Sequence, residues 1–282
     1  KPKSRIPQVA LLMQMSLKGQ ADLLRGILQF VKLHGPWRLY RMEGRPGEQR
    51  LLDLKRWGCT GIITGACDTQ EARLIARLGV PVIVCEPSPP MRQPTHPLAK
   101  FSCTNLNSYA CGKLAADYYL NRHYSQFAFV GDPCDLYWSK EREAGFRETV
   151  EKAGKTCHIY PQLSDAEKQD WAVEQPRLQA WLCALPKPTA LFAAMDGRGR
   201  QVLDACMGAD IAVPDQLAVL GVDNGELICE ATFPALSSVL TVGQQTGYLI
   251  AEHLDRLMRG DRLKKRIFTS TPTHIVTGWD SR

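Results

Sequence analysis

The stretch LAVLGVDN, residues 217–224, is a run of apolar and small residues that ends abruptly in a carboxylate and an amide. A continuous apolar run of this length is typical of a strand buried on both faces of a parallel sheet. A second stretch, ALFAAMD at residues 190–196, has the same form and also ends in an acid. Because the carboxyl ends of parallel strands lie at one edge of a sheet, we expect both acids at the same rim.

Around these two stretches, short apolar runs alternate with amphipathic segments, which is the pattern of successive βα units. Further buried strands are predicted at 9–13, 61–64, 80–84, 127–130, 157–160 and 237–240, and helices at 21–33, 69–78 and 107–122. A Pro- and Ser-rich loop at 86–97 precedes the point where the series restarts. The predicted fold class is α/β, with two doubly wound parallel-sheet lobes joined by three crossover strands.

The two lobes are predicted to exchange chain segments. The expected crossings lie near 123–126, 240–242 and 262–264. The predicted N-terminal lobe therefore comprises 6–123 and 241–262, and the predicted C-terminal lobe comprises 124–240 and 263–282. Three connections of this kind form a hinge about which two lobes can close as rigid bodies.

The composition suits a packed protein. The chain has 282 residues, 44% hydrophobic and 23% charged, which is enough for two lobes of roughly 100–150 residues each. It contains no charge-free apolar run of about 18 residues, so we expect neither a membrane span nor a signal peptide. The ten cysteines are scattered singly, a usage typical of reduced thiols, and they favour a cytoplasmic location over an oxidising compartment.

Catalytic and metal-binding motifs are missing from the sequence. There is no GxSxG elbow, no HExxH, no phosphate-binding GxxxxGK[ST] and no cysteine and histidine cluster with zinc spacing. The sequence therefore predicts no cofactor, no metal and no enzyme. One alternative stays open, in which Asp196 and Asp223 serve as the acid and the base of a sugar-active enzyme.

Five side chains form a candidate ligand site. Asp196, Asp223 and Asn224 follow the two strands quoted above, and Trp138 and Arg142 follow another predicted strand. An indole offers a flat apolar face to the C–H side of a sugar ring, and a guanidinium can hold two hydroxyl groups. Carboxylates and amides can pair with the remaining hydroxyls. The simpler interpretation is that the acids only cap helices and that the arginine only pairs with surface glutamates.

Several segments together resemble the xylose-operon regulators, the XylR-like family. They are FAF at 127–129, WSKEREAGFR at 138–147, DGRGR at 196–200, VP at 213–214 with the strand 217–224, and ALSSV at 235–239 with GY at 247–248. The resemblance extends from about residue 6 to the end and is strongest over 126–259.

The resemblance implies a type I periplasmic-binding-protein-like effector domain, of the kind found in LacI-type proteins, that is followed by a C-terminal AraC-type helix-turn-helix domain. In such regulators the effector domain is a homodimer that binds a pentose between its lobes, and the helix-turn-helix domain activates transcription of sugar-utilisation genes. Here that domain is not in the chain, so DNA is expected as a partner only through it. Carried over by position, Trp138, Arg142, Asp196 and Asp223 are the expected ligand contacts, with Asn224 second in rank.

Two departures from the family pattern keep the ligand open. The chain has NLN at 105–107, where the family tends to have an acidic Thr-Asp-Asn, and it has Thr241 where a glutamine is expected. Because Leu106 cannot bond a sugar hydroxyl, the effector could be xylose, another sugar, or no sugar at all. A periplasmic solute-binding protein, which shares this architecture, is the alternative from another class.

Overall fold

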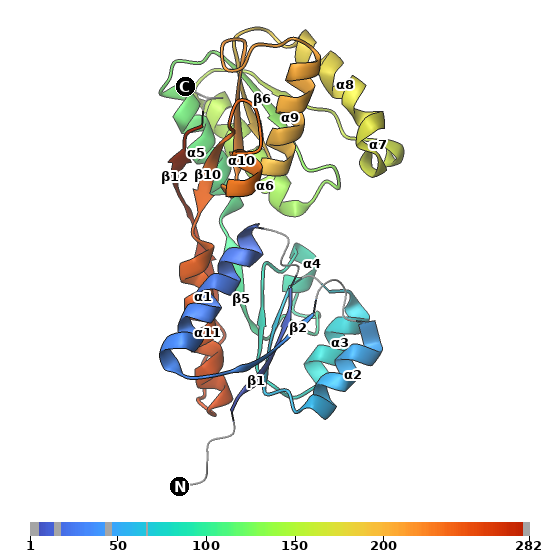
Figure 1. The fold of residues 1–282 in the computed structure, drawn as a ribbon, viewed down its shortest axis with the longest axis vertical. Helices are drawn as coiled ribbons and strands as arrows, with labels where there is room; N and C mark the ends of the chain where they lie inside the picture. The colour runs from blue at the N-terminus through green and yellow to red at the C-terminus, as the bar shows by residue number, and fades with distance from the viewer. Residues whose placement is uncertain (1–5, 14–17, 43–46, 66, 279–282) are drawn as a thin grey trace. The chain divides into compact units, whose positions relative to one another are not determined.

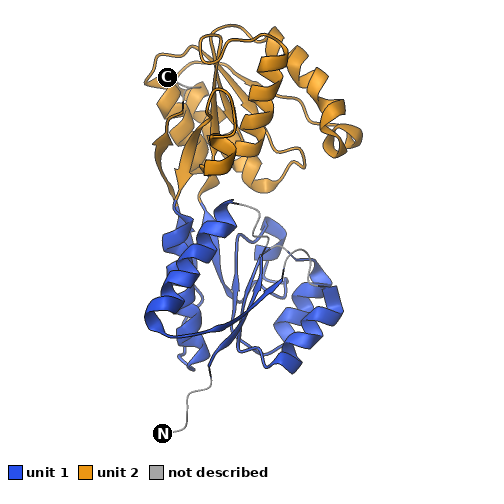
Figure 2. Cartoon of the chain, in the orientation of Figure 1, with its two compact units in different colours: residues 1–106, 242–270 blue, residues 107–241, 271–282 orange. Residues whose placement is uncertain are grey.

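The computed structural model of the chain describes residues 6–13, 18–42, 47–65 and 67–278. The chain forms two compact units, each built around its own six-stranded sheet (Figure 2). Unit 1 comprises residues 1–106 and 242–270, and unit 2 comprises residues 107–241 and 271–282. The predicted class, two parallel-sheet α/β lobes joined by three connections, is confirmed.

Unit 1 is a parallel sheet covered by helices on both faces. Its strands, in sheet order, are β11 (Ile267–Ser270), β5 (Ser102–Leu106), β4 (Val82–Val84), β3 (Gly61–Thr64), β1 (Gln8–Leu12) and β2 (Arg38–Met42). Its helices are α1 (Lys18–His34), α2 (Gly47–Trp57), α3 (Thr69–Arg77), α4 (Pro89–Arg92) and α11 (Gly243–Met258). Helices α1 and α11 lie together on one flank, and α2 and α3 lie on the other (Figure 1).

The two-residue period of β1 explains these two layers. Val9 and Leu11 are buried in the apolar cluster beneath α1 and α11, whereas Ala10 and Leu12 are buried beneath α2 and α3. Successive side chains of a strand point to opposite faces, so a strand with helices on both sides must be apolar at every position. The continuous apolar runs in the sequence follow from this requirement.

Unit 2 repeats the plan with one antiparallel edge. Its strands, in sheet order, are β12 (Pro272–Val276), β10 (Ser237–Thr241), β9 (Leu217–Val222), β8 (Thr189–Ala193), β6 (Gln126–Val130) and β7 (Cys157–Ile159), and β12 alone among these described strands is antiparallel. Its helices are α5 (Ser108–Leu120), α6 (Tyr137–Lys152), α7 (Asp165–Gln169), α8 (Trp171–Ala184), α9 (Asp196–Gly208) and α10 (Glu226–Cys229). The carboxyl ends of β6, β8 and β9 therefore share one rim.

The boundaries of the units differ from the expected ones at two crossings. The chain passes between units after residues 106, 241 and 270. Helix α5 belongs to unit 2 because its backbone touches that of α6, so closely that a Cβ added at Gly145 would collide with the Tyr109 carbonyl oxygen. Strand β11 belongs to unit 1 because it pairs with β5, which places Phe268 opposite Thr104.

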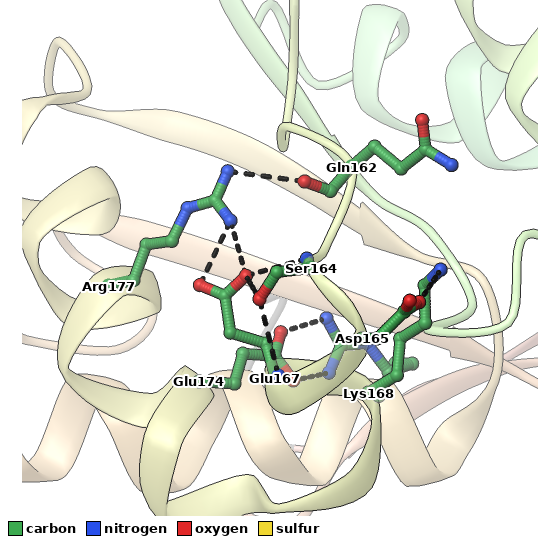
Figure 3. Close-up of polar contacts among 8 residues, drawn as sticks. Gln162, Ser164, Asp165, Glu167, Lys168, Glu174 and Arg177 are labelled. Carbon is green, nitrogen blue, oxygen red and sulfur yellow. Dashed lines mark hydrogen bonds and ion pairs between the residues drawn. The ribbon is translucent and has the colours of Figure 1, made fainter.

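Figure 3 shows how the junction of α7 and α8 is held in unit 2. The Arg177 guanidinium lies 2.8 Å from the Glu167 carboxylate and donates to the Gln162 carbonyl at 3.3 Å. Ser164 caps α7 and also donates to Glu167 at 2.7 Å. The hydrogen bonds that Ser164 and Arg177 donate to Glu167 lower the pKa of Glu167 to about 2, and the Ser164 hydroxyl contributes most. They hold the start of α8, which carries Glu174.

Within the described ranges, no helix is both long and apolar enough to cross a bilayer. The same part of the chain contains no disulfide bond and no group of three or more histidine, cysteine or acidic side chains arranged to hold a metal ion.

Candidate functional site

The predicted site residues lie along the carboxyl rim of the unit 2 sheet. Trp138 and Arg142 are on α6, which follows β6; Asp196 is the first residue of α9, which follows β8; Asp223 and Asn224 come directly after β9. These three strands are neighbours in the sheet. Segments far apart in the sequence therefore meet because the strands are parallel and adjacent.

Arg142 is the centre of this group. Its side chain is only 4% exposed, and one Nη2–Oδ1 distance of 3.5 Å joins it to Asp223. Its Nη1 donates to the Ala194 carbonyl, while its buried Nε has no hydrogen-bond partner within the described part of the chain. A buried donor without an acceptor costs free energy, about 1–3 kcal/mol or more for a charged group. The contacts with Ala194 and Asp223 therefore fix the orientation of the guanidinium, while its Nε–H is left without an acceptor among the described residues.

Trp138 packs against this arginine. The Arg142 Cζ lies 4.8 Å from the centroid of the Trp138 ring, a cation–π geometry. The two residues are four positions apart on α6, which brings their side chains to one face of the helix. The indole is only partly buried, so it keeps some exposed apolar surface.

Asp223 and Asn224 form an unusual turn. Their φ angles are 97° and 51°, in the left-handed region that non-glycine residues rarely adopt. The Asp223 N–H donates to the Val239 carbonyl at 3.0 Å, and the Asn224 N–H donates to the Ser238 Oγ at 2.9 Å. The Asp223 side chain is 25% exposed. The turn therefore presents a carboxylate that is fixed at its backbone but still accessible.

Asp196, like Arg142, is almost fully buried. It is 3% exposed, its Oδ2 accepts the Gly225 N–H at 2.6 Å, and its Oδ1 accepts the Ser238 hydroxyl at 2.6 Å. Burial, and secondarily the charge of Asp223, raises the pKa of Asp196 to about 7. Both of its oxygens are thus engaged by the protein, an arrangement that the prediction of a ligand contact did not anticipate.

Two buried groups near the rim were missed from the sequence. Ser238 bridges Asn224 and Asp196. A serine within a predicted apolar strand was the one feature of the sequence that could have pointed to this bridge. Arg198 forms a buried pair with Glu174, with N···O distances of 2.7 and 3.1 Å, and its Nε donates to the Gly131 carbonyl at 2.9 Å. Nothing in the sequence distinguishes Arg198 from the exposed Arg200 beside it.

Leu106 and Thr241, the two positions that depart from the family pattern, each have a structural place within their own unit. The Leu106 N–H donates to the Glu86 carboxylate at 2.9 Å in unit 1. Thr241 is buried at the end of β10, where the pairing with β12 shifts register.

Comparison with known proteins identifies the family. Residues 116–278 match the family model described as a periplasmic binding protein-like domain. The chain is 30% identical over 229 residues to the xylose operon regulatory protein of Escherichia coli strain K12, covering 80% of this chain and 57% of that protein. It is 35% identical over 159 residues to the protein of the same name from Haemophilus influenzae, covering 56% and 41%. The chain thus spans little more than half the length of the first of these curated relatives.

Solved structures agree with this assignment. A structure described as the xylose-binding transcription activator xylR superposes with a TM-score of 0.83 at 25% identity, covering 98% of this chain and 70% of that one. A periplasmic binding protein/LacI transcriptional regulator from Alkaliphilus metalliredigens, complexed with D-xylulofuranose, superposes with a TM-score of 0.76 at 15% identity, covering 99% and 100%, and shows likeness of fold alone. The chain belongs to the periplasmic binding protein-like domain family.

Proposed function

We propose that this chain is the effector-sensing part of a sugar-responsive transcription regulator, and that a pentose binds at the rim of unit 2. The observation that carries the proposal is Arg142, a buried arginine whose Nε has no acceptor among the described residues. It is held 3.5 Å from the accessible carboxylate of Asp223, and its guanidinium lies over the Trp138 ring.

The chemistry of these groups matches a sugar. Each hydroxyl that leaves water must regain both a donor and an acceptor, because an unpaired polar group costs about 1–3 kcal/mol. Arg142 supplies donors, Asp223 supplies acceptors, and Asn224 supplies both. The exposed part of Trp138 covers the apolar C–H face of the ring.

The relatives point to the class of sugar. The curated relatives are named for a xylose operon. The solved structures include one regulator described as xylose-binding and one described as complexed with a pentulose. Xylose is therefore the first pentose to test. Because Leu106 and Thr241 stand where polar residues are expected from the family, L-arabinose and D-ribose are tested beside it.

The relay of the signal is also a proposal. We infer that the chain works in the cytoplasm as a homodimer, that pentose binding shifts the equilibrium between two of its arrangements, and that an attached helix-turn-helix part contacts DNA. A coupling of this kind is typically worth about 1–3 kcal/mol. No catalytic step and no cofactor is part of this proposal.

Calorimetric titration with D-xylose, L-arabinose and D-ribose tests the proposed function. We expect saturable heat with at least one of them, and a rise in the melting temperature at saturation, because a ligand that binds only the folded state at 100 times its Kd adds about 2.7 kcal/mol of stability. Sucrose, which is much larger than a pentose, serves as the control. Absence of both heat and thermal shift with all three pentoses would contradict the proposal.

A further inference from the structure

Three consecutive backbone amides hold the turn after β9. The N–H groups of Asp223, Asn224 and Gly225 donate, in that order, to the Val239 carbonyl, the Ser238 Oγ and the Asp196 Oδ2. The first of these bonds continues the parallel pairing of β9 with β10. The other two bonds have side-chain acceptors, Ser238 and Asp196, and these two side chains are themselves hydrogen-bonded to each other.

Asp196 is that common point. Its Oδ1 accepts the hydroxyl of Ser238, which in turn accepts the Asn224 N–H, so a continuous chain of bonds runs from the turn to Asp196. The carboxyl group is held closely, because a Cβ added at Gly221 would collide with Asp196 Oδ1. A side chain at that position of β9 would therefore displace the carboxyl group.

We infer that Asp196 is a positioning residue of the effector site, which fixes the Asp223–Gly225 turn and thereby aims the Asp223 carboxylate toward the ligand. The inference rests on the proposed function. Asp196 then affects the ligand only through Asp223, because both Asp196 oxygens already accept hydrogen bonds from Gly225 and Ser238.

The charge on Asp196 responds to pH near neutrality. Burial is the main cause that raises its pKa to about 7, and the facing carboxylate of Asp223 adds to it, whereas the Gly225 N–H, the Ser238 hydroxyl and the Cys229 thiol lower it. Arg142, which lies 3.5 Å from the Asp223 carboxylate, is a further charged group at this rim. A ligand that removes water from this rim further disfavours two adjacent carboxylates, so binding should take up protons and weaken as the pH rises through 7.

The same group makes stability depend on pH. Since the folded-state pKa of about 7 lies above the ordinary value of 3.8, the folded state keeps a proton that the unfolded chain has lost. The resulting stabilisation is full below pH 3.8, is lost progressively as the pH rises to about 7, and does not change further above it.

The test compares Asp196→Asn and Ser238→Ala with the control Asp204→Asn. Asp204 lies on the same helix, is partly exposed and pairs with Arg200. D-Xylose, L-arabinose and D-ribose are titrated at pH 6 and pH 8 in buffers of different ionisation enthalpy, which gives both Kd and the protons taken up. Melting temperatures are recorded over the same range.

We expect Ser238→Ala to weaken pentose binding roughly tenfold, because it removes the acceptor of the Asn224 N–H and the donor to Asp196. Asp196→Asn is uncharged at every pH, as the protonated carboxyl group is, so its Kd should no longer change between pH 6 and pH 8. Proton uptake on binding, and the decline of stability between pH 5 and 7, should disappear in Asp196→Asn and persist in Asp204→Asn. If Asp196→Asn does not fold, Ser238→Ala carries the test, because it removes the two bonds of the Ser238 hydroxyl and leaves the carboxyl group and its bond to Gly225 in place.

The outcomes separate the two proposals. If the wild-type protein binds none of the pentoses, the proposed function fails, and the role of Asp196 in it fails as well. If the wild-type protein binds a pentose and both variants bind it within twofold of wild type with unchanged proton uptake, the proposed function stands and the positioning role is overturned.

Discussion

Replacing Arg198 with methionine should lower the free energy of unfolding by about 3–5 kcal/mol, as expected when one partner of a buried ion pair is removed. Arg198 and Glu174 are 3% and 2% exposed, and two hydrogen bonds join them. Methionine fills a similar volume but leaves the Glu174 carboxylate buried without its counter-ion. It also removes the donor to the Gly131 carbonyl. Urea denaturation measures the change.

The control is Arg200→Met, on the same helix. Arg200 is 46% exposed and pairs with Asp204, and surface pairs are worth about 0–1 kcal/mol. Combining Arg198→Met with Glu174→Leu should recover much of the loss, because no charge is then left buried. A loss below about 1 kcal/mol for Arg198→Met alone would show that the pair contributes no more than a surface pair does.

Replacing Arg142 with methionine should weaken pentose binding roughly 100-fold or more, because charge-assisted hydrogen bonds to a ligand are each worth about 1.5–3 kcal/mol. The substitution removes the donors beside Asp223 and the cation stacked on Trp138. Calorimetric titration of the pentose that the wild-type protein binds gives the ratio of the two Kd values.

Arg147→Met is the matched control for this change. Arg147 lies on the same helix, is 42% exposed and pairs with Glu143, so its loss should leave the Kd within threefold. Asp223→Asn keeps the volume of the turn and should weaken binding as well, since an amide replaces one acceptor oxygen by a donor. Equal pentose affinity in Arg142→Met and wild type, with both folded by melting temperature, would remove Arg142 from the site.

Most of the strands that could be predicted from the sequence lie inside a sheet; the half-buried edge strand β7, expected at 157–160, is an exception. Strands β1, β3, β6, β8 and β9 are continuously apolar apart from single polar or threonine residues at their ends, as strands buried on both faces must be. Strands β2, β5, β11 and β12 were missed. Strands β2, β11 and β12 are sheet edges with exposed positions, and β5 has the mixed sequence SCTNL, so their pairing depends on neighbours that are remote in sequence.

The position of the five candidate residues at one rim could be predicted from the sequence, but the bonds among them could not. An acid directly after a buried strand is visible in the sequence, and so is an arginine four residues after a tryptophan. The hydrogen bonds of Asp196 are not visible in the sequence, because its partners Gly225 and Ser238 lie 29 and 42 residues away. Likewise, whether Arg198 or Arg200 is buried depends on which side of α9 faces α8.

A crystal structure of the protein with the pentose it binds would decide whether the rim of unit 2 is the effector site. We predict sugar oxygens within about 3.2 Å of the Arg142 guanidinium and the Asp223 carboxylate, with the ring against Trp138 and with Asp196 still bonded to Gly225 and Ser238. A pentose bound elsewhere, with Arg142 Nε still lacking an acceptor, would show that this rim does not sense the sugar.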